Sequence, residues 1–245
     1  MRRRHVQQEL RFSKRGGKQK RAGRPAKGPR PSERHKRRTP FKASEPIHVV
    51  IRATPEVGNL RRRDIYHAVR KALVTSFKDD RFRIVHISIQ GTHVHLLCEA
   101  HDRMALARGM QGFQISAAKH INAAISKGRS TRRRGSVFPD RYHPEIITSR
   151  RRARHALAYV LNNWRKHKEH RAPLWHDHRV DPFSSGPSFE GWRDVGEALD
   201  VLPDSYEPLP VWHPKTWLLA EGWKLYGLIG TTETPGRKRV PEFAD

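Results

Sequence analysis

The sequence has one cysteine, few acidic residues and no long apolar run, and each shortage excludes a class of protein. Cys98 stands alone, so we expect neither an internal disulfide framework nor a zinc site built from several cysteines. No stretch of 18 or more apolar residues is present, and no apolar segment follows the basic N-terminus. We therefore expect a protein of the cytoplasm, associated with a prokaryotic nucleoid, with no membrane partner.

The shortage of acid leaves a large positive charge. There are 50 Lys and Arg residues against 24 Asp and Glu, which gives a formal net charge of +26 and a pI near 11.2. Such a surplus most simply matches a polyphosphate partner, and nucleic acid is the first choice.

Composition divides the chain into three segments. Residues 1–45 are rich in lysine, arginine, glycine and proline without apolar periodicity, which is typical of a disordered basic arm. Residues 46–170 carry regular apolar patterns and form the expected folded domain. Residues 171–245 are rich in proline, glycine and tryptophan. We interpret them as an irregular extension that wraps over the domain or along a ligand.

Apolar spacing predicts the elements of the domain. The expected strands are 48–54, 81–90, 92–100 and 141–149, and the expected helices are 61–77, 102–125 and 149–170. Pro144 has no backbone N–H, so the last strand is expected at a sheet edge. This order is the ferredoxin-like split β-α-β-β-α-β plan of an α+β fold, with a further helix at its end. Two helices would cover one face of the antiparallel sheet and leave the other face free.

Two histidines one residue apart mark the strand GTHVHLLCEA. Alternate residues of a strand share a face, so His93 and His95 project together. Val94, Leu96 and Cys98 point the other way and can enter the core under the two helices. On the uncovered face the imidazoles either meet a cation or phosphate, or are ordinary residents of a sheet in a chain with 16 histidines.

The residues of the last helix favour the interpretation that His93 and His95 bind a cation. His155, Tyr159 and Asn163 are four residues apart, hence on one helical face. If that face docks beside His93 and His95, two imidazoles and an amide oxygen make a three-ligand site with open positions. Such a site, completed by phosphate and water oxygens, fits Mg²⁺, and the imidazoles shift its preference toward Mn²⁺.

These motifs resemble the single-tyrosine HUH transposases, and among them the REP-associated tyrosine transposases of bacteria. The resemblance rests on the His-Val-His strand at 93–95, on FPDRYHPEIITS and above all on ALAYVLNNWRKH, and it covers about residues 46–170. It implies a catalytic tyrosine, matched by Tyr159, and a metal held by the histidine pair and by a polar residue four positions later, matched by Asn163. Many relatives have proline after this asparagine, whereas the chain reads NNW, so Asn162 is an alternative ligand.

The resemblance implies an enzyme that cleaves and rejoins single-stranded DNA next to hairpin elements. Tyr159 would attack phosphorus and keep the 5′-phosphate as a phosphotyrosine while a 3′-OH leaves. Rejoining is the reverse reaction. Relatives occur as monomers and as dimers, so a homodimer, and the use of Tyr159 in its own or its partner's site, stay open.

Basic side chains supply the expected DNA surface, because so little acid accompanies them. The candidates are Arg61, Arg62, Arg63, Arg132, Arg133, Arg134, Arg150, Arg151, Arg152, His155 and Arg165. The tryptophans Trp164, Trp175, Trp192 and Trp212 either stack unpaired bases or pin the extension to the domain.

Several alternatives remain. Tyr142 is a competing nucleophile, although it has no amide at helical spacing. Glu99 is either an orienter of a histidine or an edge carboxylate without a role. The chain is either this enzyme or a non-catalytic, domesticated protein that binds a structured DNA repeat. Replication initiators and relaxases share the chemistry, but they usually carry further domains or a third histidine near the pair, and the sequence shows neither.

Overall fold

Residues 93–100, where the sequence alternates, form one of the two inner strands of a four-stranded antiparallel sheet. The computed structural model describes residues 39–172, 178–194, 202 and 205–234. Its strands are β1 (Ile47–Arg52), β2 (Phe82–Ile89), β3 (His93–Ala100) and β4 (His143–Ile146), in the order β2-β3-β1-β4. All neighbours are antiparallel, and β4 lies at an edge, as Pro144 predicts.

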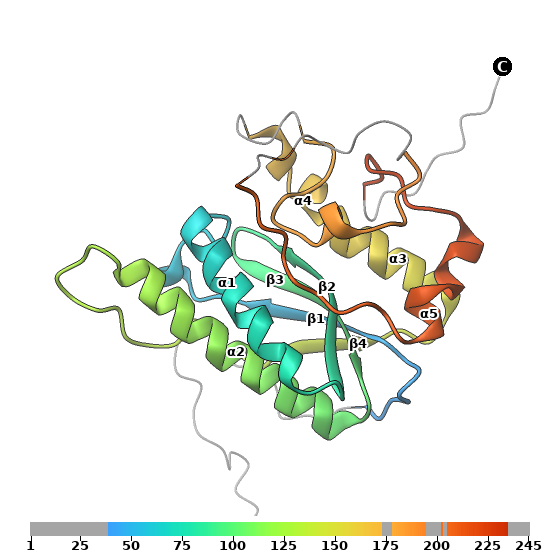
Figure 1. Ribbon diagram of the computed structural model, residues 1–245, viewed down its shortest axis with the longest axis horizontal. Coiled ribbons are helices and arrows are strands. Elements are labelled where there is room, and N and C mark those ends of the chain that lie inside the picture. Colours follow the sequence, from blue (N-terminus) through green and yellow to red (C-terminus); the bar gives the residue numbers. More distant parts are fainter. Residues whose placement is uncertain (1–38, 173–177, 195–201, 203–204, 235–245) are drawn as a thin grey trace, which may run out of the picture. The chain divides into compact units, whose positions relative to one another are not determined.

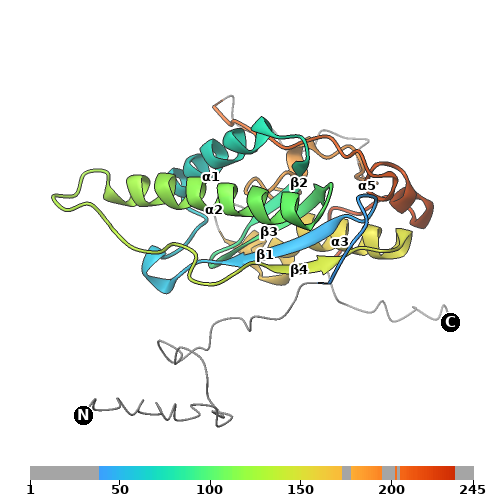
Figure 2. The same ribbon diagram turned by 90° about the horizontal axis from the view of Figure 1, so that it is seen from below.

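Two long helices cover one face of this sheet, as predicted. They are α1 (Arg63–Thr75) and α2 (Arg103–Ser126), and they lie side by side across the strands (Figures 1 and 2). α2 begins at Asp102, whose side chain accepts hydrogen bonds from the backbone N–H groups two and three residues later at 2.7 and 2.8 Å. Val94, Leu96 and Cys98 of β3 are buried under these helices. We call this cluster the α1–α2 core.

The opposite face of the sheet is covered as well, which corrects the expectation of a free face. α3 (Arg150–Leu161) packs Leu157 and Leu161 into a second buried cluster that contains Leu97 of β3. The extension adds Trp223 and Ile229 to the same cluster beside the short helix α5 (Trp217–Ala220). The free face was a wrong prediction because both the last helix, α3, and the extension pack on it; the extension thus wraps over the domain, one of the two arrangements expected for it.

The last helix is interrupted, whereas the sequence predicts one helix from 149 to 170. α3 ends at Leu161, and a second short helix, α4 (Asn163–Lys166), follows. Asn162, at the break, has φ −104° and ψ 13°, and its Nδ2 donates to the carbonyl of Gly230 at 3.0 Å. The extension therefore holds the chain at the point where the helix changes direction.

Glu99 anchors the extension to the sheet. This fully buried carboxylate accepts hydrogen bonds from the backbone N–H groups of Lys215 and Thr216, at 3.0 and 2.8 Å. It also accepts from the guanidinium of Arg83 at 2.8 Å. Glu99 is thus neither an orienter of a histidine nor an idle edge residue, because its two oxygens are used to fasten the extension.

One residue of the expected basic arm contacts the domain. Phe41 packs against the α1–α2 core. Residues 1–38 of the expected arm lie outside the described residues. None of the helices in the described ranges is long and apolar enough to cross a membrane.

Candidate active site

His93 and His95 lie on the face of β3 away from the α1–α2 core, as predicted. β1 runs antiparallel beside them, with Val50 opposite His95 and His48 opposite Leu97, so these side chains share that face. His48 Nε2 lies 3.0 Å from His95 Nδ1, and the two rings stack with centroids 5.2 Å apart. A third imidazole therefore holds the second histidine of the pair in place.

Tyr159 of α3 reaches this histidine cluster. Its ring meets the His95 ring edge to face at a centroid distance of 5.4 Å, and the His48 ring at 5.7 Å. Lys166 of α4 places its Nζ 3.3 Å from the phenol oxygen and 4.8 Å from the centre of the tyrosine ring. His167 follows, with its ring 5.2 Å from that of His93. The fold thus gathers a phenol, an ammonium and several imidazoles from β1, β3, α3 and the end of α4.

Burial keeps the inner imidazoles neutral. Burial, together with smaller contributions from the neighbouring imidazoles and Lys166, lowers the pKa of His95 to about 2. Burial likewise lowers the pKa of His93 to about 4, and burial together with nearby His143 lowers the pKa of His48 to about 4. A neutral imidazole keeps a lone pair on one ring nitrogen, and with this lone pair it can accept a proton or bind a cation.

Two polar side chains of the expected ligand set are buried with atoms that lack a hydrogen-bond partner in the described part of the chain. They are His95, through Nε2, and Asn163, through both carboxamide atoms. Asn162 is similar, because its Oδ1 also lacks a partner in the described residues, while its Nδ2 is bonded to the carbonyl of Gly230. A buried polar atom without a partner is costly, and such atoms often mark the place of a ligand. Both asparagines therefore have an available amide oxygen, and Asn162 stays an alternative to Asn163 as the ligand.

The described residues include no group of three His, Cys, Asp or Glu side chains arranged to hold a metal ion. A cation beside His93 and His95 would therefore need oxygen donors from other sources, such as the Asn163 amide or a phosphate.

Arg61 is buried, which corrects its predicted place on the DNA surface. Its guanidinium donates to both oxygens of Asp181, at 3.0 and 2.8 Å, and its Nε lies 3.1 Å from a Glu169 oxygen. The side chain of Arg61 is only 2 % exposed and that of Asp181 is fully buried. A guanidinium enclosed by two carboxylates cannot reach a DNA phosphate, so its role is structural.

The predicted DNA-binding role of Arg165 is corrected as well. Its guanidinium donates to the carbonyls of Thr231 and Arg179, at 2.6 and 2.9 Å, so it is committed to the extension. Arg133 is partly committed as well, since it hydrogen-bonds Asn122 and, at 3.2 Å, the carbonyl of Ser136.

The other predicted DNA-binding residues are exposed. They are Arg62, Arg63, Arg132, Arg134, Arg150, Arg151, Arg152 and His155. Arg152 and His155 line a cavity that also contains Tyr159. The loop after α2, with residues 132–134, and the start of α3, with residues 150–152, lie at opposite ends of the sheet in both views (Figures 1 and 2). The arginine runs therefore do not form one continuous patch.

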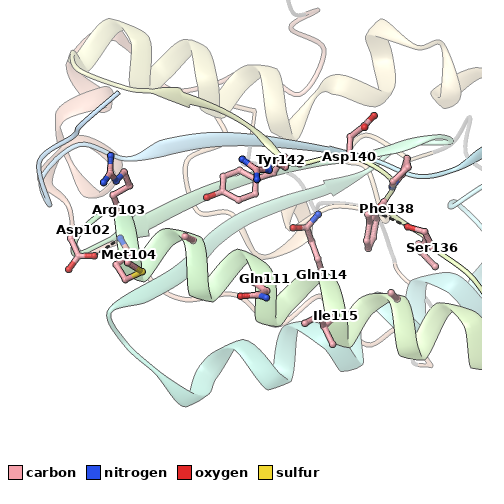
Figure 3. Close-up of a pocket in the computed structure, with 15 residues that line it drawn as sticks. Asp102, Arg103, Met104, Gln111, Gln114, Ile115, Ser136, Phe138, Asp140 and Tyr142 are labelled. Carbon is pink, nitrogen blue, oxygen red and sulfur yellow. Dashed lines mark hydrogen bonds between the residues drawn. The ribbon is translucent and has the colours of Figure 1, made fainter. Parts of the chain in front are cut away.

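A larger cavity, of about 1120 Å³, lies between α2 and the segment that leads into β4 (Figure 3). Tyr142, the competing nucleophile, forms part of its wall and packs into the α1–α2 core. None of the predicted catalytic, metal-binding or DNA-binding residues lines this cavity. Tyr142 therefore lies with the core on one face of the sheet, whereas the histidines lie on the other face.

The tryptophans mostly serve packing. Trp164 and Trp192 are buried, and Trp212 stacks on Phe77 with ring centroids 4.8 Å apart. These three pin the extension and the last helices to the domain, which is the second of the two roles expected for them. Trp175 lies outside the described residues.

Three members of the cluster were not predicted from the sequence. His48 stands two residues before Val50 on a strand whose register only the structure reveals. Lys166 and His167 fall in the motif ALAYVLNNWRKH, and Lys166, seven residues or two helical turns after Tyr159, could have been placed on the same face from spacing alone. For His48 the available signal was the alternation in HVVIR, which places it on the same face as Val50.

Comparisons with known proteins agree with this fold and these motifs. The family model described as transposase, IS200-like, matches residues 43–163, the segment that contains His93, His95, Tyr159 and Asn163. No curated protein matches the chain. The solved structure of a REP-associated tyrosine transposase bound to a REP hairpin has the same fold, with a TM-score of 0.51. It is 17% identical over 71% of this chain and 96% of that chain.

A second solved structure, from Deinococcus radiodurans R1, is 12% identical over 56% of this chain and 95% of that chain, and its TM-score of 0.35 is too low to bear on the fold. The family assignment depends on the sequence match and on the motifs within it. Residues 43–163 of the chain therefore belong to the IS200-like transposase family.

Proposed function

We propose that the chain is a metal-dependent transposase that cleaves and rejoins single-stranded DNA through Tyr159. The observation that carries this proposal is the phenol of Tyr159, held against His95 and His48 with the Lys166 ammonium 3.3 Å from its oxygen. The family match supports DNA transposition as the overall reaction. The REP hairpin in the related solved structure supports a hairpin next to the cleaved strand.

Tyr159 is the nucleophile of this mechanism. Its Oη attacks phosphorus, a bond from Oη to phosphorus forms, and the bond from phosphorus to the 3′ oxygen breaks, with the phenol proton ending on the departing 3′-OH. The phosphotyrosine retains the energy of the broken bond, so attack by another 3′-OH rejoins strands without ATP. The Lys166 ammonium, 3.3 Å from the phenol oxygen, would stabilise negative charge that develops on this oxygen during the attack.

The donor atoms of the site fit a divalent cation. His95 Nε2 and the Asn163 carboxamide are buried without partners in the described structure, and His93 lies beside His95 with ring centroids 4.7 Å apart. These three residues would hold Mg²⁺ or Mn²⁺, which when bound supplies Lewis-acid polarisation of a phosphate oxygen. With the His95 proton on Nδ1, that N–H would donate to His48 Nε2, 3.0 Å away, and the lone pair on His95 Nε2 would be left for the cation.

The DNA path follows α3. Arg152, His155 and Tyr159 are three to four residues apart and line one cavity, so the basic end of the helix leads to the nucleophile. Exposed arginines bind phosphates without sequence preference, and a single strand exposes the phosphate that stacking would otherwise hide. Tyr159 contacts His95 of its own chain, so we place the nucleophile in cis; a homodimer is not needed to assemble this set.

The test is a covalent-adduct assay on single-stranded DNA from the flanks of the coding region, including any hairpin, with Mn²⁺. The wild type should form an adduct that survives denaturation, and Tyr159→Phe or EDTA should abolish it. Tyr142→Phe is the matched control, because it removes a phenol oxygen on the other face of the sheet and should leave the adduct intact. Adduct formation by Tyr159→Phe at the wild-type rate would show that another group is the nucleophile. A protein that binds the hairpin but forms no adduct with any divalent metal would instead be a non-catalytic DNA-binding protein.

A further inference from the structure

A cavity of about 330 Å³ opens beside Tyr159, between α3 and the β1–β4 edge of the sheet. His48, His95 and Tyr159 of the catalytic cluster line one part of it, and Val50, Ile147 and Ala156 form an apolar part of the wall. Its polar lining includes Glu145 of β4 and Arg152 of α3, whose charged groups are 3.7 Å apart. These two side chains are 60 % and 58 % exposed, so neither is locked into the protein interior.

We propose that this cavity binds one unpaired base of the DNA strand, and that it prefers guanine. The inference rests on the proposed function, because it places this base next to the phosphate that Tyr159 attacks. It goes beyond that function by assigning a subsite and a sequence preference to residues outside the catalytic cluster.

The apolar part of the wall and Glu145 suit a base better than a phosphate, whereas the attacked phosphate would lie at the other part, against Tyr159 and His95. Aliphatic side chains cannot replace the hydrogen bonds that a phosphate loses when it leaves water, whereas the flat face of a base packs well against them. The carboxylate of Glu145 would also repel a phosphate but accepts hydrogen bonds from the edge of a base. The volume lies at the lower end of the range for ligand cavities, which matches a group of the size of one nucleotide.

The pair of charges selects among the bases. A carboxylate only accepts hydrogen bonds and a guanidinium only donates them. The Watson–Crick edge of guanine offers two adjacent donors, N1–H and the 2-amino group, to Glu145, and its O6 accepts from Arg152. Cytosine and adenine each offer a single amino group, and thymine offers one N–H between two carbonyl oxygens. In a single strand this edge is free to be recognised.

The test measures binding, so it does not depend on cleavage. Tyr159→Phe, which cannot form the adduct, is mixed with fluorescent thymidine pentamers that carry guanine, hypoxanthine, cytosine, adenine or thymine at the middle position, and the Kd is measured by anisotropy. We expect the guanine pentamer to bind roughly tenfold more tightly than the thymine pentamer, with hypoxanthine, which lacks the 2-amino group, between them.

Adding Glu145→Gln to Tyr159→Phe should remove most of this preference. The control is Glu221→Gln in the same background, which changes the net charge equally at an exposed carboxylate that pairs with Lys224 outside the cavity. It should tighten binding of all pentamers alike and keep the guanine preference. Equal affinities for all five pentamers, tighter binding of another base, or a guanine preference that survives Glu145→Gln would each overturn the assignment. The adduct assay decides the proposed function separately.

Discussion

Replacing His48 tests whether this residue positions His95. If His95 holds a cation through Nε2, its proton is on Nδ1, and the 3.0 Å contact is a hydrogen bond from His95 to His48 Nε2. His48→Ala leaves that N–H unpaired on a ring that is only 3 % exposed. An unsatisfied buried donor costs about 1–3 kcal/mol of stability, and loss of a bond that orients a metal ligand lowers metal affinity about 10- to 100-fold.

The assay is titration of the purified protein with Mn²⁺, followed by electron paramagnetic resonance, with thermal unfolding measured in parallel. His48→Gln retains an acceptor and should recover part of the lost affinity. The control is His86→Gln, since His86 is buried and its Nδ1 lies 3.2 Å from Ser185 Oγ in another part of the sheet. It should cost stability without changing Mn²⁺ affinity. Wild-type Mn²⁺ affinity in a folded His48→Ala protein would refute the positioning role.

Three further predictions concern single residues. Arg61→Ala leaves the Asp181 carboxylate buried and unpaired, so urea unfolding should show a loss of about 3–5 kcal/mol; a loss below 1 kcal/mol would contradict the buried pair. Lys166→Met removes the ammonium beside Tyr159, so the single-turnover rate of adduct formation should fall at least tenfold; an unchanged rate would rule that role out. Burial lowers the pKa of His86 to about 4, so between pH 6.5 and 4 this imidazole binds a proton in the unfolded state but not in the folded state. Stability should therefore fall by about 1.4 kcal/mol per pH unit between pH 6.5 and 4 from this group, and the wild type minus His86→Gln difference should show that slope in urea unfolding at several pH values.

Much of the fold was predictable because local patterns determine it. The alternation around Val94 and Leu96 places one face of β3 in the core, and the apolar spacing after Asp102 predicts α2 with its N-cap. Pro144 predicts an edge strand. Each of these signals depends on residues close together in the sequence, so the local sequence is enough to predict the element.

The contacts that fasten the extension over the histidine face, and part of the site, were not predictable, because they join residues far apart in the sequence. Arg61 was expected on the surface since its partner Asp181 comes 120 residues later. His48 joins His95 through a strand register that composition does not reveal. The helix break at Asn162 lies between Tyr159 and Lys166, and the partner of Asn162 there is the Gly230 carbonyl.

The bond between Asn162 and Gly230 also has a consequence for the order of events during synthesis. The two residues are 68 positions apart, and Arg154 of α3 pairs with Glu233, 79 positions later. When the helix that bears Tyr159 leaves the ribosome, the residues that fasten both its ends have not yet been made. The helix is therefore fastened only after residues 230–233 have been made, and a nascent or truncated chain that lacks them should have the DNA-attracting arginines without a fixed tyrosine.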